Sequence, residues 1–296
     1  MRLSSLFLFG LILLLLTGCN QEVEITPVNT DYAEYTSIVN KGSDTLVNLA
    51  LAWAEMFHQL HPTVEISITG GGTGTGIAAL INGTVDIANA SRQIKTEELQ
   101  LAEDNGGSPV EFVVAKDAIA IIVNPNNPVN QLTIQQLSDI YSGKINNWSD
   151  LGGEDRIIIR LSRETNSGTH VFFLENVVRM GDPDDKTLFS SDTLLLPSSE
   201  GITAETRDNP NAIGYDGLGY VTPDVKVLAV GPSSSGPFVL PSADTVNNRQ
   251  YPIARDLYMY TNKLPTGVIA DYIDWIMTSE AQTIVTKLGF VPLVKP

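Results

Sequence analysis

Cysteine is almost absent from this sequence of 296 residues, in which Cys19 stands alone. A single thiol cannot form a disulfide within the chain, so the fold must depend on its hydrophobic core. Basic residues are also scarce: 18 lysines and arginines face 34 aspartates and glutamates, which gives a formal net charge of −16. A surface of that sign repels nucleic acid and anionic lipid, and we exclude both as partners. An anion site in this chain would have to depend on local contacts.

One apolar run stands out near the N-terminus. Residues 6–16 are almost wholly apolar, which is the length of a signal-peptide core and too short to span a bilayer comfortably. The run is followed by Thr17-Gly18-Cys19, which resembles the bacterial lipobox, where a diacylated cysteine becomes the new N-terminus. We expect residues 1–18 to be a lipoprotein signal peptide, Cys19 to carry lipid and residues 19–35 to form a tether. The alternative is an ordinary secretory signal that ends near a cysteine by chance.

The expected location follows from that anchor. Two or more acyl chains hold a protein stably on a membrane that it does not cross. We therefore expect an extracytoplasmic protein, attached to a bacterial membrane in the cell envelope or periplasm.

Helical and strand-like apolar patterns alternate along the rest of the chain. Apolar residues recur at spacings of three and four over residues 46–60, whereas Val64, Ile66 and Ile68 alternate as in a half-buried strand. Residues 118–123 form a continuous apolar run, typical of a strand covered on both faces. This alternation predicts an α/β fold with largely parallel sheets. At ~100–200 residues per domain, the length predicts two lobes.

Three segments share one construction, in which a strand ends, glycine or hydroxyl residues follow, and a helix begins. They are Gly42-Ser43-Asp44-Thr45, Gly72-Thr73-Gly74-Thr75-Gly76 and Arg163-Glu164-Thr165-Asn166-Ser167-Gly168-Thr169. A helix start leaves backbone N–H groups unpaired and carries partial positive charge, glycine admits an anion to the backbone, and a hydroxyl adds a donor. Arg163 can grip an oxyanion bidentately. Each segment alone could be only a capped helix or a loop, but together they favour an oxyanion site.

On these motifs the sequence resembles the phosphate-binding lipoproteins of bacterial ATP-driven (ABC) phosphate importers, which are two-lobed members of the periplasmic binding protein superfamily. The resemblance covers nearly all of the mature chain and includes residues 90–92, 145–148 and 211–215. It implies two lobes, each a mixed, mostly parallel sheet flanked by helices, with the ligand cleft between them. Lobe one would comprise residues 36–118 plus 252–296, and lobe two residues 119–251.

The resemblance also implies a function and a set of contacts. The protein would capture inorganic phosphate and deliver it to a permease and ATPase complex, as a monomer without enzymatic activity, cofactor or metal. The residues that we expect at the phosphate, from the matching motifs and their neighbours, are Asp44, Thr45, Leu46, Thr73, Ser91, Arg92, Arg163, Ser167, Gly168 and Thr169.

Two positions depart from the family pattern. Many relatives carry an aspartate where this chain has Arg92, and an acid where it has Thr165. Phosphate near neutral pH keeps a proton that needs an acceptor, and a carboxylate both accepts it and repels fully ionised sulfate. Asp44 is the first substitute to consider, unless it only caps its helix, and Glu164 is the second. Arg92 would either donate to the anion or pair with a neighbouring acid.

Three rival functions stay open at this point. The segment from Arg163 to His170 is also similar to that of tungstate and molybdate binders, so another tetrahedral oxyanion, sulfate included, could be the ligand. A hydrolase could use Ser167 with His170, but the imidazole would face along the helix and no orienting acid is evident. His58 and His61 lack a nearby third metal ligand. A sensor or adhesin could keep the fold without feeding a transporter.

Overall fold

The computed structural model describes residues 35–293, so the predictions for the signal peptide, for Cys19 and for residues 19–34 of the tether lie outside it. Its strands are β1 (Thr36–Gly42), β2 (Val64–Thr69), β3 (Ile87–Ala90), β4 (Val110–Val123), β5 (Gln131–Thr133), β6 (Ile159–Arg163), β7 (Leu194–Leu196), β8 (Ala212–Gly217), β9 (Lys226–Gly231) and β10 (Ala254–Thr261). Its α-helices are α1 (Val47–Leu60), α2 (Thr73–Ile81), α3 (Thr96–Asp104), α4 (Ile134–Tyr141), α5 (Gly168–Phe173), α6 (Ser199–Asp208), α7 (Ala243–Asn247), α8 (Val268–Ile276) and α9 (Ser279–Lys287). The 3₁₀ turns are η1 (Asp44–Leu46), η2 (Trp148–Leu151) and η4 (Leu218–Tyr220), and η3 (Leu174–Val178) is a π-helical turn.

The strands form one mixed sheet in the order β2-β1-β3-β10-β4-β8-β6-β7, and β9 joins it by pairing with β4 and β5. The pairs β1–β2, β1–β3, β5–β9, β6–β7 and β6–β8 are parallel. Every antiparallel pairing between these described strands involves β4 or β10. The predicted α/β class is confirmed, and the antiparallel part comes from the two strands that connect the lobes. No helix among residues 35–293 is long and apolar enough to cross a membrane.

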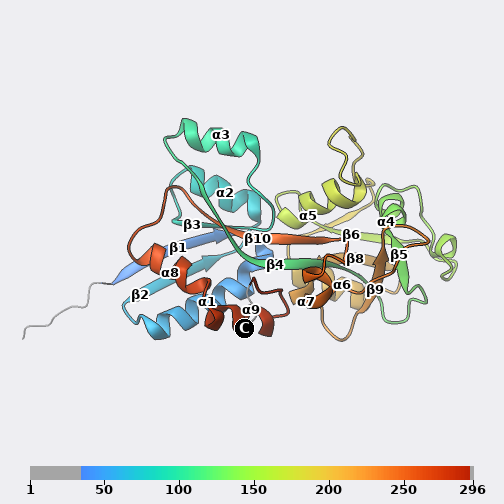
Figure 1. Cartoon of the computed structure of the whole chain (residues 1–296). Helices are drawn as coiled ribbons and strands as arrows, with labels where there is room; N and C mark the ends of the chain where they lie inside the picture. Colours follow the sequence, from blue (N-terminus) through green and yellow to red (C-terminus); the bar gives the residue numbers. More distant parts are fainter. Residues whose placement is uncertain (1–34, 294–296) are drawn as a thin grey trace, which may run out of the picture. The chain divides into compact units, whose positions relative to one another are not determined.

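Lobe one consists of β1–β3, α1–α3, α8 and α9, and it has a helical layer on each face of its strands. On one face α1, α8 and α9 bury a core that contains Trp53, Phe57 and Tyr272. On the other face α2 and α3 bury a second core, to which α2 contributes Ile77 and Leu80. Figure 1 shows α2 and α3 above the strands and α1 and α9 below them. The helical spacing of residues 46–60 is explained by this arrangement, since one face of α1 must meet the sheet.

Lobe two consists of β5–β9 and α4–α7, with a large core on one face of its strands and a smaller one on the other. One face is aromatic: Tyr141, Phe173 and Tyr215 pack together, and the rings of Phe173 and Tyr215 stack with centroids 3.7 Å apart. On the other face Ile202 of α6 packs against Leu161 of β6. The start of α6 meets the ends of β6 and β8, because Ser199 is hydrogen-bonded to both Arg163 and Asp216, and Arg163 pairs there with Asp44 of lobe one.

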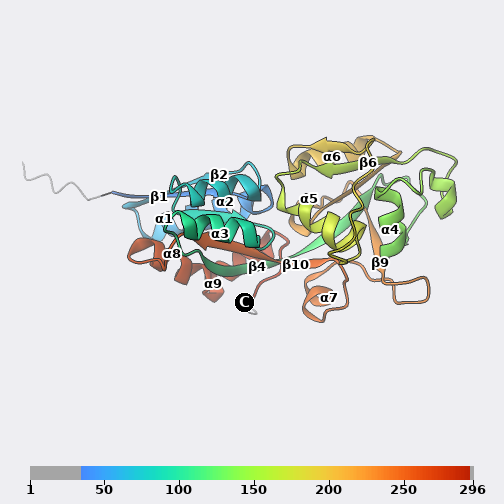
Figure 2. The same ribbon diagram turned by 90° about the horizontal axis from the view of Figure 1, so that it is seen from above.

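Strands β4 and β10 belong to both lobes, as Figure 2 shows from above. On β4, Ala115 lies in the core of lobe one and Ala118 in that of lobe two. On β10, Leu257 packs in lobe one and Ala254 against lobe two. The chain thus crosses between its two cores within a few residues on each strand. The lobe boundaries at residues 118 and 252 stay a prediction.

Candidate functional site

The lobe-one side of the cleft is built by two glycine-dependent turns. A side chain on Gly42 would lie under 3.0 Å from the carbonyl of Asn89, and its φ of +144° also favours glycine. The N–H of Gly72 donates to the carbonyl of Gly42 (2.9 Å), which ties the turn before α2 to the end of β1. Thr45 and Thr73, the hydroxyl residues that follow these turns, are both buried. The two predicted helix starts therefore lie side by side.

The lobe-two side begins where α5 starts. Ser167 caps this helix, since its Oγ accepts a hydrogen bond from the N–H of Thr169 (3.2 Å). Gly168 lies against lobe one: a Cβ at this position would be under 3.0 Å from the hydroxyl oxygens of Ser91 and Thr73. Glycine is thus what lets the start of α5 approach lobe one so closely.

Four buried hydroxyl groups from both lobes meet at this point. Thr45 Oγ1 lies 3.0 Å from Thr169 Oγ1, across the cleft. Thr73 Oγ1 accepts from the N–H of Ser91 (3.0 Å) and lies 3.3 Å from Ser91 Oγ. Hydroxyl hydrogens rotate, so each group can donate to a bound anion. The structure brings these four predicted residues together.

Arg163 ends β6, five residues before the start of α5, and is 1% exposed. Its Nη1 donates to Ser199 Oγ (2.8 Å), and its Nη2 donates to the carbonyl of Pro197 (2.8 Å). Nη2 also forms an ion pair with Asp44, which belongs to lobe one. The predicted cation is therefore at the end of β6, and its Nη2 donates to a carboxylate from the facing lobe.

Three other expected groups are engaged or directed elsewhere. Arg92 forms a bidentate ion pair with Glu98, with N–O distances of 2.6 and 2.8 Å, as the salt-bridge alternative had it. Burial would raise the pKa of Glu98, but hydrogen bonds from Arg92 and from the N–H of Lys95 lower it below the usual value. The N–H of Leu46 donates to Ser43 (3.0 Å), and the side chain of Glu164 is exposed.

A second arginine, which is not among the site residues predicted from the sequence, reaches the hydroxyl cluster. Arg255 of β10 donates through Nη2 to Thr169 Oγ1 (2.9 Å) and to Thr45 Oγ1 (3.4 Å). Its Nη1 donates to the carbonyl of Ser91 (2.9 Å). The guanidinium therefore contacts three of the clustered residues at once. The available signal was an arginine two residues before the apolar run of residues 257–260, because an arginine in a buried strand is seldom without a partner.

The partner of Arg255 is Asp117 of β4, its direct neighbour across the antiparallel pair. Asp117 Oδ2 accepts from Arg255 Nη2 (2.9 Å) and Nε (3.2 Å), and Oδ1 accepts from the N–H of Leu218 (3.1 Å). Burial raises the pKa of Asp117, while the charge of Arg255 acts in the opposite direction. This pair lies where β4 and β10 pass from one core to the other. It therefore holds a cation at the junction of the lobes.

Arg255 also lines a hollow of about 460 Å³ beside the cluster. The other lining residues include Arg92, Phe172, Asn176 and Tyr258. The guanidinium carbon lies 5.5 Å from the centre of the Phe172 ring, a cation–π distance. The buried cation thus stands between this hollow and the hydroxyl cluster.

The arrangement around His170 does not resemble a nucleophile and its base. His170 Nδ1 lies 2.9 Å from the carbonyl of Arg163 and 3.0 Å from Ser162 Oγ. A carbonyl only accepts, so Nδ1 carries the proton, and burial lowers the pKa of His170. Within residues 35–293 no hydrogen bond joins Ser167 to His170, and no group of three or more metal-binding side chains is found.

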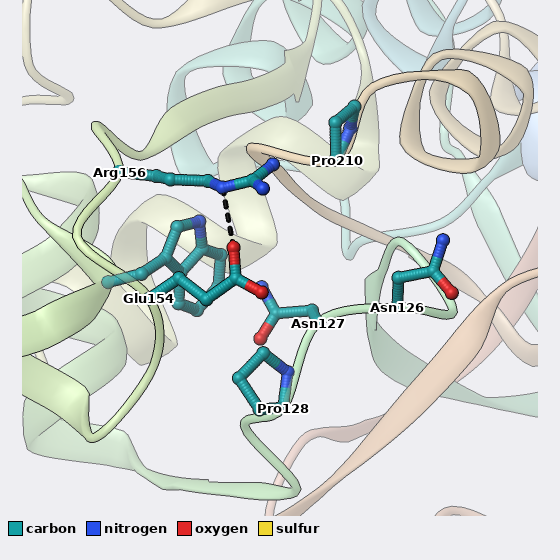
Figure 3. A pocket seen from close by; sticks show the side chains of 7 residues that line it. Asn126, Asn127, Pro128, Glu154, Arg156 and Pro210 are labelled. Carbon is teal, nitrogen blue, oxygen red and sulfur yellow. Dashed lines mark ion pairs between the residues drawn. The ribbon is translucent and has the colours of Figure 1, made fainter.

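A separate hollow of about 280 Å³ lies elsewhere in lobe two, lined by Asn126, Asn127, Pro128, Trp148, Glu154, Arg156 and Pro210. Figure 3 shows that its cation, Arg156, points at Glu154, and the two form an ion pair of 2.7 Å. The charge of Arg156 is thus matched by a carboxylate at the surface. This hollow lacks the buried hydroxyl groups that distinguish the cleft.

Comparison with known proteins adds independent information. Residues 27–280 match the PBP superfamily domain. The phosphate-binding protein PstS of Pseudomonas aeruginosa PAO1 is 34% identical over an alignment of 269 residues that covers 85% of this chain and 81% of that protein. PstS of Bacillus subtilis 168 is 30% identical over 298 residues, covering 99% and 94%. A putative phosphate ABC transporter substrate-binding protein from Clostridium perfringens, solved with bound phosphate, is 32% identical with a TM-score of 0.78, covering 88% and 100%.

Proposed function

We propose that this chain, which belongs to the PBP superfamily and within it to the PstS phosphate-binding proteins, captures inorganic phosphate and delivers it to an ABC importer. Four buried hydroxyl groups from both lobes meet in the cleft, the buried Arg255 donates to two of them, and the buried Arg163 pairs with Asp44, the neighbour of Thr45; this arrangement carries the proposal. The Clostridium perfringens relative, 32% identical, was solved with bound phosphate.

The proposed phosphate contacts come from both lobes and from the crossing strand β10. They are Thr45, Thr73, Ser91, Arg163, Ser167, Gly168, Thr169 and Arg255. Hydroxyl and backbone donors supply hydrogen bonds without adding charge, and the arginines supply the attraction that the acidic surface lacks. The site is thus suited to a compact tetrahedral oxyanion that can accept from many directions.

Asp44 has a special place in this proposal, because its carboxylate already pairs with Arg163 across the cleft. A carboxylate and a phosphate oxygen compete for the same N–H donors of a guanidinium. When phosphate binds, Asp44 is left beside it as an acceptor for the phosphate proton. The same carboxylate would repel sulfate, which has no proton to offer.

Competition between oxyanions tests the ligand. We expect calorimetric titration of the purified protein to give a phosphate dissociation constant at least about tenfold below those of sulfate, molybdate and tungstate. A difference of ten in affinity is only about 1.4 kcal/mol, which one unfavourable charge contact can supply. Tighter binding of any of the other three anions would assign this cleft to that anion.

The proposed role is binding without turnover. The expected result with a chromogenic phosphomonoester is no product release above the buffer rate, and sustained hydrolysis that requires Ser167 would return the hydrolase alternative. Genes for a permease and an ATPase beside the gene for this chain would favour transport over a sensor or adhesin role.

Gly168→Ala is expected to weaken phosphate binding by tenfold or more while each lobe stays folded. The added Cβ would lie under 3.0 Å from the hydroxyl oxygens of Thr73 and Ser91, so the start of α5 must withdraw from lobe one. Calorimetry measures the affinity, and circular dichroism checks the fold. Gly74→Ala is the matched control, because its Cβ would lie 3.5 Å from the carbonyl of Asn166, an ordinary contact. Equal affinities of the two variants would argue against close approach at Gly168.

We also propose that the chain is a monomer held on the outer side of a membrane by lipid on Cys19. Cys19→Ser should abolish acyl labelling and move the protein from the membrane fraction to the soluble fraction, because Cys19 is the only thiol in the sequence. The measurement is metabolic labelling with a fatty acid followed by fractionation. A Cys19→Ser protein that still takes up fatty acid and pellets with membranes would exclude this anchor.

A further inference from the structure

Asp216 is a buried carboxylate that the proposed phosphate contacts leave unused. It lies on β8, is 0% exposed, and its Oδ1 accepts from Ser199 Oγ (2.9 Å) and from the N–H of Gly217 (2.8 Å). No group among residues 35–293 donates a hydrogen bond to its Oδ2. Both oxygens of Asp117, by contrast, are hydrogen-bonded. A bare carboxylate oxygen in the interior disfavours the ionised form.

A single hydroxyl group connects Asp216 to the cation of the anion site. Ser199 Oγ accepts from Arg163 Nη1 (2.8 Å) and donates to Asp216 Oδ1 (2.9 Å). Arg163 in turn pairs with Asp44 at the cleft. Asp216 is therefore linked to Arg163 through Nη1 and Ser199, whereas Asp44 pairs with Nη2, and Asp216 itself is buried.

Carboxylates outnumber arginines around Asp216. The titratable and charged groups that face it are Arg163 on β6, Asp117 on β4, Arg255 on β10, Tyr215 on β8 and Tyr220 on η4, while α6 contributes Ser199 and its neighbour Glu200 is exposed. Two arginines thus already serve the three carboxylates of Asp44, Asp117 and Asp216. Burial raises the pKa of Asp216 to about 7, with Arg163 opposing and Asp117 adding to the rise.

We propose that Asp216 takes up one proton from solvent, on its unpaired Oδ2, when phosphate binds to Arg163. The inference rests on the proposed function and makes Asp216 a positioning residue that couples phosphate capture to pH. A bound anion draws on the charge of Arg163 and adds negative charge nearby, so the carboxylate of Asp216 becomes the carboxylic acid. The step is balanced: the proton binds Oδ2 and no other bond is made or broken.

The sign of the pH dependence follows. Where Asp216 is ionised in the free protein, binding requires a proton, so phosphate affinity falls as pH rises above about 7. The slope for one linked proton is at most about tenfold in Kd per pH unit. Below the pKa the carboxyl is already protonated, and this contribution vanishes.

Calorimetry of phosphate binding at pH 7, in two buffers of different ionisation enthalpy, counts the protons taken up. Wild type should take up about half a proton more than Asp216→Asn, since a group near its pKa is half ionised. The proton on phosphate itself is common to both proteins and cancels in the difference. The matched control is Asp192→Asn. Asp192 pairs with Arg160, which lies on β6 as Arg163 does, but the side chain of Asp192 is largely exposed. It should take up as much as wild type.

A second variant keeps the inference testable if Asp216→Asn fails to fold. Ser199→Ala removes a donor from the ionised carboxylate, which raises its pKa. Its proton uptake at pH 7 should fall, and the uptake maximum should shift to higher pH. Equal uptake in wild type, Asp216→Asn and Ser199→Ala would overturn the role of Asp216. Absence of any phosphate binding by wild type would instead overturn the proposed function.

Discussion

Arg163→Ala is expected to weaken phosphate binding by at least ~30-fold. The guanidinium is buried at the end of β6 and its Nη2 donates to Asp44 of lobe one, so phosphate would meet it away from bulk water. Removing one partner of a buried, hydrogen-bonded charge pair costs roughly 2–5 kcal/mol, and each 1.4 kcal/mol is a factor of ten in affinity. The measurement is calorimetric titration with phosphate at fixed salt and pH.

Two further variants make this test specific. Arg163→Lys should recover only part of the affinity, because an ammonium group cannot reproduce the bidentate fork. Arg156→Ala should bind as wild type does, since that arginine lies in the other hollow, paired with Glu154. A loss of less than threefold in Arg163→Ala would remove Arg163 from the site.

Arg255→Ala is expected to reduce the free energy of unfolding by about 3–5 kcal/mol and to abolish measurable phosphate binding. The stability loss arises because the carboxyl group of Asp117, which is 0% exposed, would remain in the interior without the arginine that pairs with it. The binding loss arises because Arg255 contacts the hydroxyl groups of Thr45 and Thr169. Denaturant unfolding gives the first quantity and calorimetry gives the second.

A double variant separates the two effects. Asp117→Asn with Arg255→Met removes both charges and keeps an acceptor for the N–H of Leu218, so most of the stability should return. Phosphate binding should not return, because the cation is still missing. If the double variant regains phosphate affinity, Arg255 serves only as a partner for Asp117 and has no part in holding the anion.

Local features of the fold could be predicted well from sequence. Thr133 forms a capping box with Gln136 at the start of α4. Ser167 likewise caps α5. These outcomes depend on groups within four residues of each other, whose geometry the chain itself determines. The α/β class followed in the same way from hydrophobic spacing.

The partners of the charged residues could not be predicted in this way. Arg92 could have reached the anion or a neighbouring acid, and packing brings Glu98 to it. Asp44 and Arg163 meet from facing lobes.

By itself, then, the sequence determined which segments become helices and strands and where small, hydroxylated helix starts occur, because those properties depend on neighbours along the chain. Only the tertiary structure decided that Asp117 and Arg255 face each other, through the antiparallel register of β4 and β10. It also decided that Asp216 lies behind Arg163, with Ser199 between them. The physical reason is that burying a charge is costly without a partner. That partner is determined by strand register and by the packing of the lobes, which local sequence patterns do not specify.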